Sequence, residues 1–564
     1  MYYYGVNPTD KREKLKNSVA AKPFLDEIIQ KADVAINEAS PAFKMSEYML
    51  FYKNGNRRVF ERGYFERRNK CFSILVAYWI TEDEKYLMPL VDYITYICDE
   101  FSWCVPAHSF MENKPEGKVS EGIIGEIDLF QAETARLFAE IMMCVGDKLP
   151  EYTKDRMNYE VNRRIINTFE NGTVCHWERA RSNWVAVCGA GSATAITCFG
   201  TEEQKAKYIP RYLGWLDTYL ESIYEDGCCL EGNAYWGYGV EHFTILAELV
   251  RLLTDGKVNY FEKDKVRKLA LFPQNVRMSD SKLVAFSDGG EVFKFKMGLI
   301  CFFKKLYSEV QLPELKYGTY CGNVHSVCEL LWFDDNYIEE PRKNNTFFYD
   351  EAQWYISRKE KYSFAAKGGH NDEPHNHNDL GGFMITCGDE TFISDLGCGE
   401  YIKETFMAET RYNYIQNSSR GHSVPIINGE YQKEGVEYSA KNVKATDDSF
   451  ELDIAGAYEK GLVEEIKRSF KLYSDKIILR DNFKRSPNTK TLTERIVSKI
   501  KPELKDGLVE YGIGRISYDA KRYIASLSED SFVAHNGVDV VNVYLVDFAP
   551  KNEDENEFVL EIIV

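Results

Sequence analysis

GGHNDEPHNHNDLGGF, residues 368–383, is the stretch on which the interpretation of the whole chain depends. It holds three of the nine histidines, His370, His375 and His377, directly before an apolar run. So polar a segment is costly beside a buried strand unless its groups find partners. His375 and His377 are two residues apart, so on a strand they share a face, where both could bind a metal or one could bind while the other catalyses. The alternative is that these groups only hydrogen-bond to loops at the rim of a sheet.

Two further candidate ligands lie downstream of this stretch. Asp395 is part of TFISDLG (391–397), and His422 is part of SSRGHSVPIING (418–429). Imidazole and carboxylate groups suit Zn²⁺. His377, Asp395 and His422 are therefore a candidate zinc site, with His377 and Asp395 expected on neighbouring strands. Three residues without a fixed spacing also arise by chance, and an Asp before Leu-Gly is a common turn residue.

The pattern of apolar residues changes along the chain. After about residue 345, short β-branched and aromatic runs such as FMITCG, KIILRDNF and VNVYLVDF alternate with Gly, Asn, Asp and Ser clusters, which is typical of an antiparallel β-sandwich. Up to about residue 335, apolar residues recur at helical spacing, as in 71–80, 127–143 and 241–253. Short loops between these stretches predict antiparallel helical hairpins that can close into a toroid. The expected domains are residues 1–340 and 341–564.

The helical part holds two further segments with candidate site residues. SNWVAVCGAG (182–191) places Asn183 and Trp184 before small residues suited to close helix packing. EDGCCLEGNAYWGYGVEHF (225–243) contains Tyr235, Trp236 and Tyr238, and the two tyrosines share a face if the stretch is helical. An aromatic cluster is more often part of a core. A Tyr phenol has an ordinary pKa of about 10, so it acts as a base only where nearby positive charge or donors lower that value.

Composition restricts the classes of partner. A net charge of −18 argues against nucleic acid or an anionic membrane, although a local cluster such as Arg179, Arg181, Arg411 and Arg420 can still attract an anion. Aromatic residues make up 14% of the chain and suit stacking on sugar rings. No secretory leader or membrane-spanning run is visible, and the 14 scattered cysteines suit a reducing compartment. We expect a cytoplasmic protein, or a periplasmic or secreted one if a leader was removed. The sequence leaves the oligomeric state open, and a homo-oligomer is one alternative.

Together these segments resemble the heparinase II/III-like polysaccharide lyases, a family with an N-terminal α/α toroid and a C-terminal antiparallel β-sandwich. HNHNDLGGF (375–383), the following SDLG and GHSVPIING carry the resemblance most specifically. The Asn-Trp and Tyr-Trp segments, WCVPAH (103–108) and DLFQAET (128–134) are similar to its toroid motifs. The resemblance covers most of the chain. It implies a multidomain toroid-and-sandwich fold and cleavage of acidic, uronate-containing glycans by β-elimination.

The resemblance also implies roles for single residues. Asn183 is expected to bind the substrate carboxylate, while Tyr235 and His375 transfer protons, with Tyr238 as the alternative to Tyr235. Some relatives have His directly after the Asn, where this chain has Trp184. His377, Asp395 and His422 match a structural metal site, for which Zn²⁺ is expected, and no organic cofactor is expected. The residues expected to contact substrate, in a cleft between the domains, are Trp184, Trp236, Arg181, His370 and Arg420.

Two other functions fit parts of the sequence. A glycoside hydrolase on an α/α toroid would need a positioned pair of carboxylates, and Asp226, Glu231 and Glu241 are available without any pattern that pairs them. A catalytically inactive carbohydrate-binding protein with the same fold is the second alternative, which Trp184 keeps open. Ultraviolet absorbance of an unsaturated uronate product separates the lyase from both.

Overall fold

The chain folds into two compact units whose sequences are interleaved. A computed structural model describes residues 2–109, 127–320 and 325–564. Unit 1 consists of Met1–Ile223, Trp236–Arg267 and Lys294–Glu340, and unit 2 consists of Tyr224–Tyr235, Lys268–Phe293 and Pro341–Val564. The predicted domains, residues 1–340 and 341–564, are consecutive, whereas unit 2 also takes in two earlier segments, 224–235 and 268–293.

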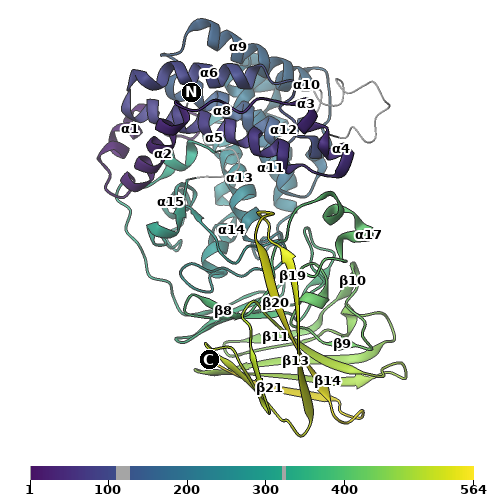
Figure 1. The fold of residues 1–564 in the computed structure, drawn as a ribbon. Helices are drawn as coiled ribbons and strands as arrows, with labels where there is room; N and C mark the ends of the chain where they lie inside the picture. Colours follow the sequence, from purple (N-terminus) through teal and green to yellow (C-terminus); the bar gives the residue numbers. More distant parts are fainter. Residues whose placement is uncertain (1, 110–126, 321–324) are drawn as a thin grey trace. The chain divides into compact units, whose positions relative to one another are not determined.

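Unit 1 is built of helices, as the apolar spacing predicts (Figure 1). The stretches singled out at 71–80 and 241–253 lie within α5 and α13, and the stretch at 127–143 forms α8 from residue 129 on. The main helices of the unit are α1 (Pro8–Asn17), α2 (Lys22–Ala35), α5 (Arg58–Thr81), α6 (Leu87–Cys98), α8 (Leu129–Val145), α9 (Glu151–Val161), α11 (Asn183–Phe199), α12 (Glu202–Glu221), α13 (Asn233–Leu253) and α15 (Met297–Leu306).

Helix α11 packs closely against its neighbours because its sequence is rich in small residues. A Cβ atom added at Gly191 would lie 2.4 Å from the carbonyl oxygen of Ala132 in α8, and one at Gly189 would lie 3.0 Å from the Trp215 ring in α12. Neither position has room for a side chain. The predicted close packing of this segment is therefore confirmed, and it fixes the helix that begins at Asn183.

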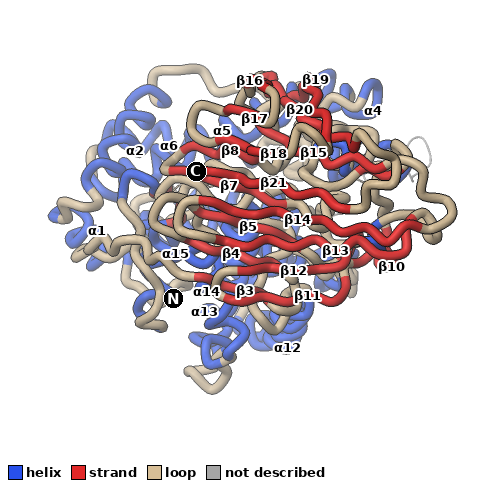
Figure 2. Tube along the Cα trace, turned by 90° about the horizontal axis from the view of Figure 1, so that it is seen from below, coloured by secondary structure: helices blue, strands red, loops and turns tan. Residues whose placement is uncertain are grey.

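Unit 2 is built of antiparallel sheets (Figure 2). One sheet has the order β3 (Thr346–Tyr349), β4 (Trp354–Arg358), β5 (Ser363–Lys367), β7 (Phe383–Cys387), β8 (Glu390–Ile393). The largest has the order β11 (Lys441–Thr446), β12 (Ser449–Asp453), β13 (Val463–Leu472), β14 (Lys476–Arg485), β21 (Glu557–Ile563), β18 (Arg515–Tyr518), β17 (Leu508–Glu510), β16 (Glu503–Lys505). A third has the order β19 (Tyr523–Val533), β20 (Val540–Pro550), β15 (Leu492–Ser498), β9 (Ile426–Ile427).

The first two sheets enclose a common core of aromatic and aliphatic side chains. Tyr355 of β4 stacks on Phe450 of β12 with ring centroids 5.2 Å apart. Phe364 of β5 lies 5.0 Å from Phe470 of β13. Buried and exposed residues alternate along β13 and β14, so one face of this sheet enters the core. This is the sandwich that the short, alternating runs predict.

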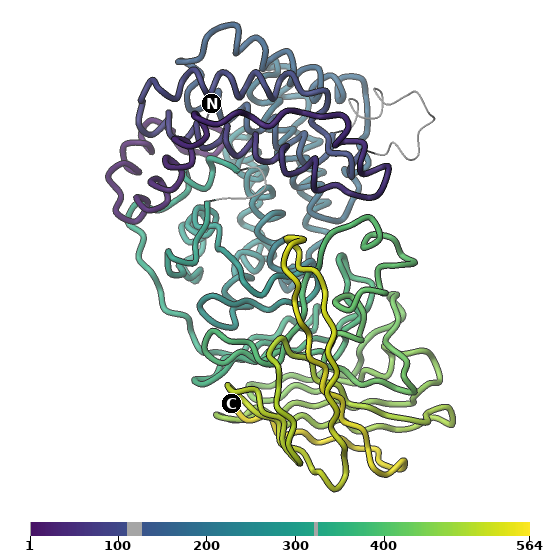
Figure 3. Tube along the Cα trace, viewed as in Figure 1, coloured from purple at the N-terminus to yellow at the C-terminus, as the bar shows by residue number. Residues whose placement is uncertain are grey.

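The two earlier segments of unit 2 attach to the same sheet of the sandwich. The Ser279 hydroxyl donates to Asp389 at 2.6 Å, and the Ala285 N–H donates to the Met384 sulfur at 3.4 Å. The carboxylate of Asp226 accepts the N–H of Glu351 at 3.0 Å. Figure 3 traces these segments in teal. They bring residues from the middle of the sequence to the sheet that contains β7 and β8.

Strands β7 and β8 pair antiparallel, with Ile385 opposite Ile393 and Cys387 opposite Glu390. The start of β7 and the end of β8 therefore lie at the same end of the sheet, and the segments 372–382 and 394–402 meet there. The β19–β20 hairpin, yellow in Figure 3, joins them through the bridge between Gly399 and Ala534. The described cysteines are all free, and none of the described helices is long and apolar enough to cross a membrane.

Candidate functional site

His375 lies in a loop and not on a strand. The segment between β6 (His370–Asn371) and β7 has no regular structure, which corrects the expectation that His375 and His377 share a strand face. His375 has a φ of 58°, in the left-handed region that residues other than Gly seldom adopt. Such strain persists only where the surroundings hold it, and it concentrates at functional sites. The side chain is 23% exposed, so a substrate can reach it.

The carboxylate of Asp288 collects three donors from different parts of unit 2. Its Oδ2 lies 2.6 Å from Nδ1 of His375 and accepts the hydroxyl of Tyr401 at 2.7 Å. Its Oδ1 lies 3.0 Å from Nε2 of His377. The guanidinium of Arg411 adds positive charge 3.7 Å from Oδ2. Burial by itself raises the pKa of Asp288, but the contacts with the two histidines outweigh it and hold that pKa well below its ordinary value.

Tyr235, the third residue of α13, completes this cluster. Its ring stacks on the His375 imidazole with centroids 4.2 Å apart and an interplanar angle of 27°. Its hydroxyl lies 2.8 Å from that of Tyr401. Since the single hydrogen of Tyr401 goes to Asp288, Tyr235 is the donor of this bond. Burial, with the charge of Asp288 next, raises the pKa of Tyr235 well above its ordinary value, so the phenol keeps its proton at neutral pH.

Sequence reasoning missed Asp288 and Tyr401. Asp288 precedes a Gly-Gly pair, which is typical of a turn, and Tyr401 is one of 37 tyrosines. Neither has a neighbour in sequence with which it forms a motif. They gain a role only because the fold brings them to His375.

A second group lies beyond His377. Asp379, Asp395 and His422 each offer a buried ligand atom, and these atoms lie within 4.8 Å of one another. Asp395 and His422 are among the predicted metal ligands, and Asp379 is not. His377 is not in this group of three, although its ring centroid lies 5.5 Å from that of His422. Among the described residues its Nδ1 is buried without a hydrogen-bond partner.

The donor set of this group fits a divalent cation. Nε2 of His422 lies 2.9 Å from the carbonyl oxygen of Gln416, which can only accept, so Nε2 carries a hydrogen. In a neutral ring Nδ1 then presents a lone pair to Oδ2 of Asp395, 3.2 Å away. Two acceptors so close need a proton or a cation between them. Ligand atoms in a tetrahedral zinc site lie about 3.3 Å apart, given metal–ligand distances of about 2.0–2.2 Å. Asp379, Asp395 and His422 could therefore hold Zn²⁺, and Nδ1 of the neighbouring His377 is a candidate fourth ligand.

Lys367 supplies a fixed positive charge beside this group. Its ammonium lies 2.8 Å from Oδ1 of Asp379 and 3.9 Å from Glu373, and all three side chains are fully buried. Burial raises the pKa of Glu373 to about 7. The ammonium offsets part of the negative charge and leaves Oδ2 of Asp379 without a hydrogen-bond partner among the described residues.

The other predicted proton-transfer and carboxylate-binding residues lie in unit 1. Asn183 is the first residue of α11 and is 5% exposed. Tyr238 donates its hydroxyl to Glu133 at 3.0 Å. Of Tyr235 and Tyr238, Tyr235 is the one that belongs to unit 2, where its ring stacks on His375. Trp236 is only 1% exposed and offers no face to a sugar, because it packs in the core.

The remaining predicted substrate contacts are scattered. Trp184 is half-buried, with the rings of His108 and His176 at 4.9 and 5.3 Å, so it belongs to an aromatic patch of unit 1. Arg181 is exposed and pairs with Glu221 at 3.1 Å. In unit 2, His370 lies 3.3 Å from the Tyr224 hydroxyl. Arg420 lies 3.3 Å from Asp530.

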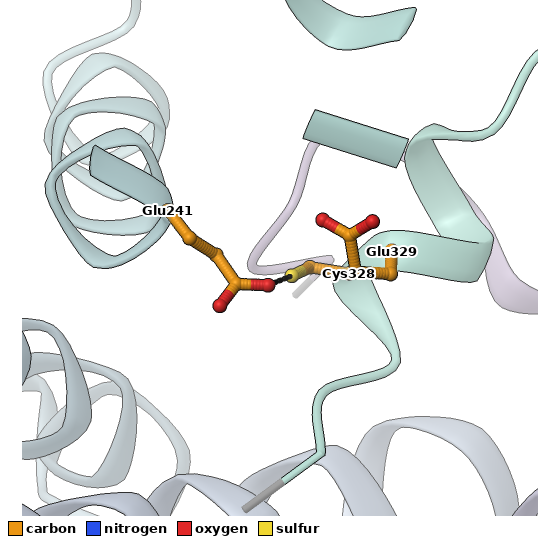
Figure 4. Close-up of side chains that lie close together, drawn as sticks. All are labelled: Glu241, Cys328 and Glu329. Carbon is orange, nitrogen blue, oxygen red and sulfur yellow. Dashed lines mark hydrogen bonds between the residues drawn. The ribbon is translucent and has the colours of Figure 1, made fainter. Parts of the chain in front are cut away.

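Glu241, Cys328 and Glu329 form a separate buried group in unit 1 (Figure 4). The ammonium of Lys296 already contacts Glu241. Both oxygens of Glu329 accept N–H groups from the first turn of α15, those of Gly298 at 2.8 Å and Leu299 at 3.1 Å. These partners fill the roles that a cation would take, so the group is a polar element of the core. Burial, with the neighbouring Glu241 next, raises the pKa of Glu329 to about 8.

Comparison with solved structures identifies the architecture. Heparinase III superimposes with a TM-score of 0.61 over 90% of this chain and 77% of its own, at 14% identity. The heparan sulfate lyase HepC from Pedobacter heparinus gives 0.57 over 96% and 82%, at 13% identity. A mutant chondroitin AC lyase from Streptomyces coelicolor A3 gives 0.51 over 99% and 82%, at 9% identity.

The chain has the polysaccharide lyase fold. The expected architecture, an α/α toroid followed by an antiparallel β-sandwich, is thereby confirmed. By sequence, no protein-family model and no curated protein matches the chain.

Proposed function

We propose that this chain is a polysaccharide lyase that cleaves uronate-containing acidic glycans by β-elimination. The observation that carries the proposal is the stack of Tyr235 on His375, two groups suited to proton transfer, within a fold that the chain shares with lyases. The similar structures are named as lyases of heparan sulfate and chondroitin, and we infer an acidic glycan of that kind for this chain.

His375 is the proposed base. The C5 proton of a uronate is weakly acidic, and its removal becomes feasible when hydrogen bonds stabilise the charge that develops on the carboxylate. Nδ1 of His375 faces Asp288, so Nε2 is the nitrogen available to take a proton. General base catalysis of this kind contributes about 10²–10⁴-fold. We propose Asn183, an amide donor, as the group that binds the carboxylate.

Tyr235 is the proposed acid. The departing C4 oxygen needs a proton, and a phenol whose pKa is raised well above its ordinary value is protonated at neutral pH. A protonated phenol favours an arrangement with His375 as base and Tyr235 as acid over one in which a single Tyr performs both proton transfers. A Tyr acting as base would need its pKa lowered. Asp288 is not suited to act as the acid of a glycoside hydrolase, because its two oxygens are engaged by donors.

We propose a structural role for the metal. A bound divalent ion would neutralise the acidic group of Asp379 and Asp395. His377 and His422 would be held with it, and His377 lies two residues from His375. No step of the elimination requires a Lewis acid if Asn183 stabilises the carboxylate.

The test is a screen of heparan sulfate, chondroitin sulfate and other uronate-containing glycans, read by ultraviolet absorbance. Elimination leaves a 4,5-unsaturated uronate, which absorbs, whereas hydrolysis adds water across the broken bond. Appearance of the absorbing product supports the proposal. New reducing ends without absorbance would identify a hydrolase. Binding without turnover of any glycan would identify an inactive carbohydrate-binding protein.

A further inference from the structure

We propose that Asp288 is a positioning residue that sets the tautomers of His375 and His377 together. One carboxylate lies 2.6 Å from Nδ1 of His375 and 3.0 Å from Nε2 of His377, and it is only 4% exposed. The opposite nitrogen of each ring then keeps its lone pair, with which it can accept a proton or bind a metal. The use of His375 as a base rests on the proposed function, whereas the tautomer of His377 does not.

The hydrogen positions follow from the chemistry of the carboxylate. An ionised carboxylate only accepts, so each group that faces it must present a hydrogen. Besides the two imidazoles, the Tyr401 hydroxyl donates to it at 2.7 Å, and Arg411 lies 3.7 Å away. A neutral imidazole has a single N–H. His375 is therefore protonated at Nδ1 and His377 at Nε2, and the lone pairs lie on Nε2 of His375 and Nδ1 of His377.

Each freed nitrogen faces a different environment. Nε2 of His375 belongs to a side chain that is 23% exposed, and its nearest ion-pair partner is Glu231 at 3.7 Å. Nδ1 of His377 is buried without a hydrogen-bond partner among the described residues, and the ring lies 5.5 Å from that of His422. A buried nitrogen with a free lone pair is costly unless a ligand uses it.

Asp288 thus links the orientation of His377, the proposed metal ligand, to the orientation of His375, the proposed base. At His377 it forms the carboxylate–histidine arrangement that orients a metal-binding imidazole and fixes its tautomer. At His375 the same carboxylate holds a ring whose backbone, with a φ of 58°, is strained. Because His375 contacts Oδ2 and His377 contacts Oδ1, both oxygens are needed.

This need for two oxygens makes Asp288→Asn a sharp test. The amide keeps the shape of the carboxylate but has one acceptor and one donor. Whichever imidazole faces the NH₂ group must present a lone pair to it, and so carries its hydrogen on the other nitrogen. Either Nε2 of His375 or Nδ1 of His377 then loses its lone pair. Asp389→Asn is the matched control, since Asp389 also lies in unit 2 and accepts from Ser279 and Ser281.

The experiment is nitrogen NMR of the full chain with ¹⁵N-labelled histidine, with signals assigned through His375→Gln and His377→Gln. The wild type should show the hydrogen on Nδ1 of His375 and on Nε2 of His377. Asp288→Asn should invert at least one of them, and Asp389→Asn neither. After reconstitution with Zn²⁺, elemental analysis should show less zinc in Asp288→Asn if His377 is the inverted ring. If His375 is inverted, kcat should fall about 10²-fold or more, with KM changed little.

Opposite tautomers in the wild type, or unchanged tautomers in a folded Asp288→Asn protein, would overturn the assignment. If Asp288→Asn fails to fold, the wild-type spectrum alone decides. If the wild type cleaves no acidic glycan, the proposed function fails, while the tautomers and the zinc content still test the role of Asp288.

Discussion

Replacing Tyr235 by Phe removes one hydroxyl and separates proton transfer from folding. The Tyr235 hydroxyl donates to Tyr401 at 2.8 Å, while Tyr401 keeps Asp288 as its own acceptor at 2.7 Å. No buried donor loses its partner, so the unfolding free energy should change by only about 0.5–1.5 kcal/mol. Loss of the proposed acid should lower kcat by about 10²–10⁴-fold. That corresponds to a barrier higher by roughly 3–5 kcal/mol.

Tyr238→Phe is the matched control, because it removes the same atom three residues away. The Tyr238 hydroxyl donates to Glu133, a carboxylate that is 1% exposed, so its loss should cost about 1–3 kcal/mol of stability. The two variants should therefore show a crossed pattern. In Tyr235→Phe, turnover should fall and the Tm should stay within a few degrees of the wild type. In Tyr238→Phe, the Tm should fall further than in Tyr235→Phe, and turnover should fall less. The assay is the initial rate of ultraviolet absorbance, with Tm measured by calorimetry.

Two results would refute this reasoning. Near-normal turnover by Tyr235→Phe would remove Tyr235 from the chemistry. Near-normal turnover by Tyr235→Phe together with an inactive, folded Tyr238→Phe would transfer the acid role to Tyr238.

Two further predictions concern the buried polar groups. His377→Ala should lower the zinc content and the Tm together, and elemental analysis that finds no metal in carefully purified wild type would exclude the site. Burial raises the pKa of Glu329 from 4.5 to about 8, so the folded protein holds a proton that the unfolded chain releases. Stability should then fall as pH rises from about 4.5 to 8, by at most about 1.4 kcal/mol per pKa unit. Glu329→Gln should flatten this fall in denaturant titrations across that range, and an unchanged pH dependence would contradict the raised pKa.

The sequence predicts the elements of this fold well because their signals are local. The helical spacing at 127–143 becomes α8, and FMITCG becomes β7. The HNHN segment is different, because contacts outside the local pattern hold it as a loop. Asn376 donates to Asn378, and His375 and His377 both contact the distant carboxylate of Asp288. Gly369 and Gly381, with φ of 86° and 84°, bound a stretch that the alternation rule treats as extended.

The site is predictable only where its residues belong to a motif. Four of the site residues lie in segments that their composition makes recognisable, namely His375, His377, Asp395 and His422. Asp288 does not, because its partner His375 is 87 positions away, and Tyr401 lies 113 positions from Asp288. Asp379 stands two residues from His377 but resembles a turn residue before Leu-Gly. Contacts at such separations are set by the fold.

The interleaving of the two units has a consequence for how the protein is made and inherited. The segments that carry Tyr235 and Asp288 leave the ribosome before any strand of the sandwich exists, and β21, which lies between β14 and β18, follows all the other described strands in the sequence. At about 5–20 residues per second, these segments wait on the order of ten seconds or more for their partners. A gene fragment that encodes only residues 341–564 would lack both side chains. Recombination at residue 340 would likewise transfer a sandwich without Tyr235 and Asp288, so a recombinant keeps the cluster around His375 only if the segments 224–235 and 268–293 are exchanged together with the sandwich.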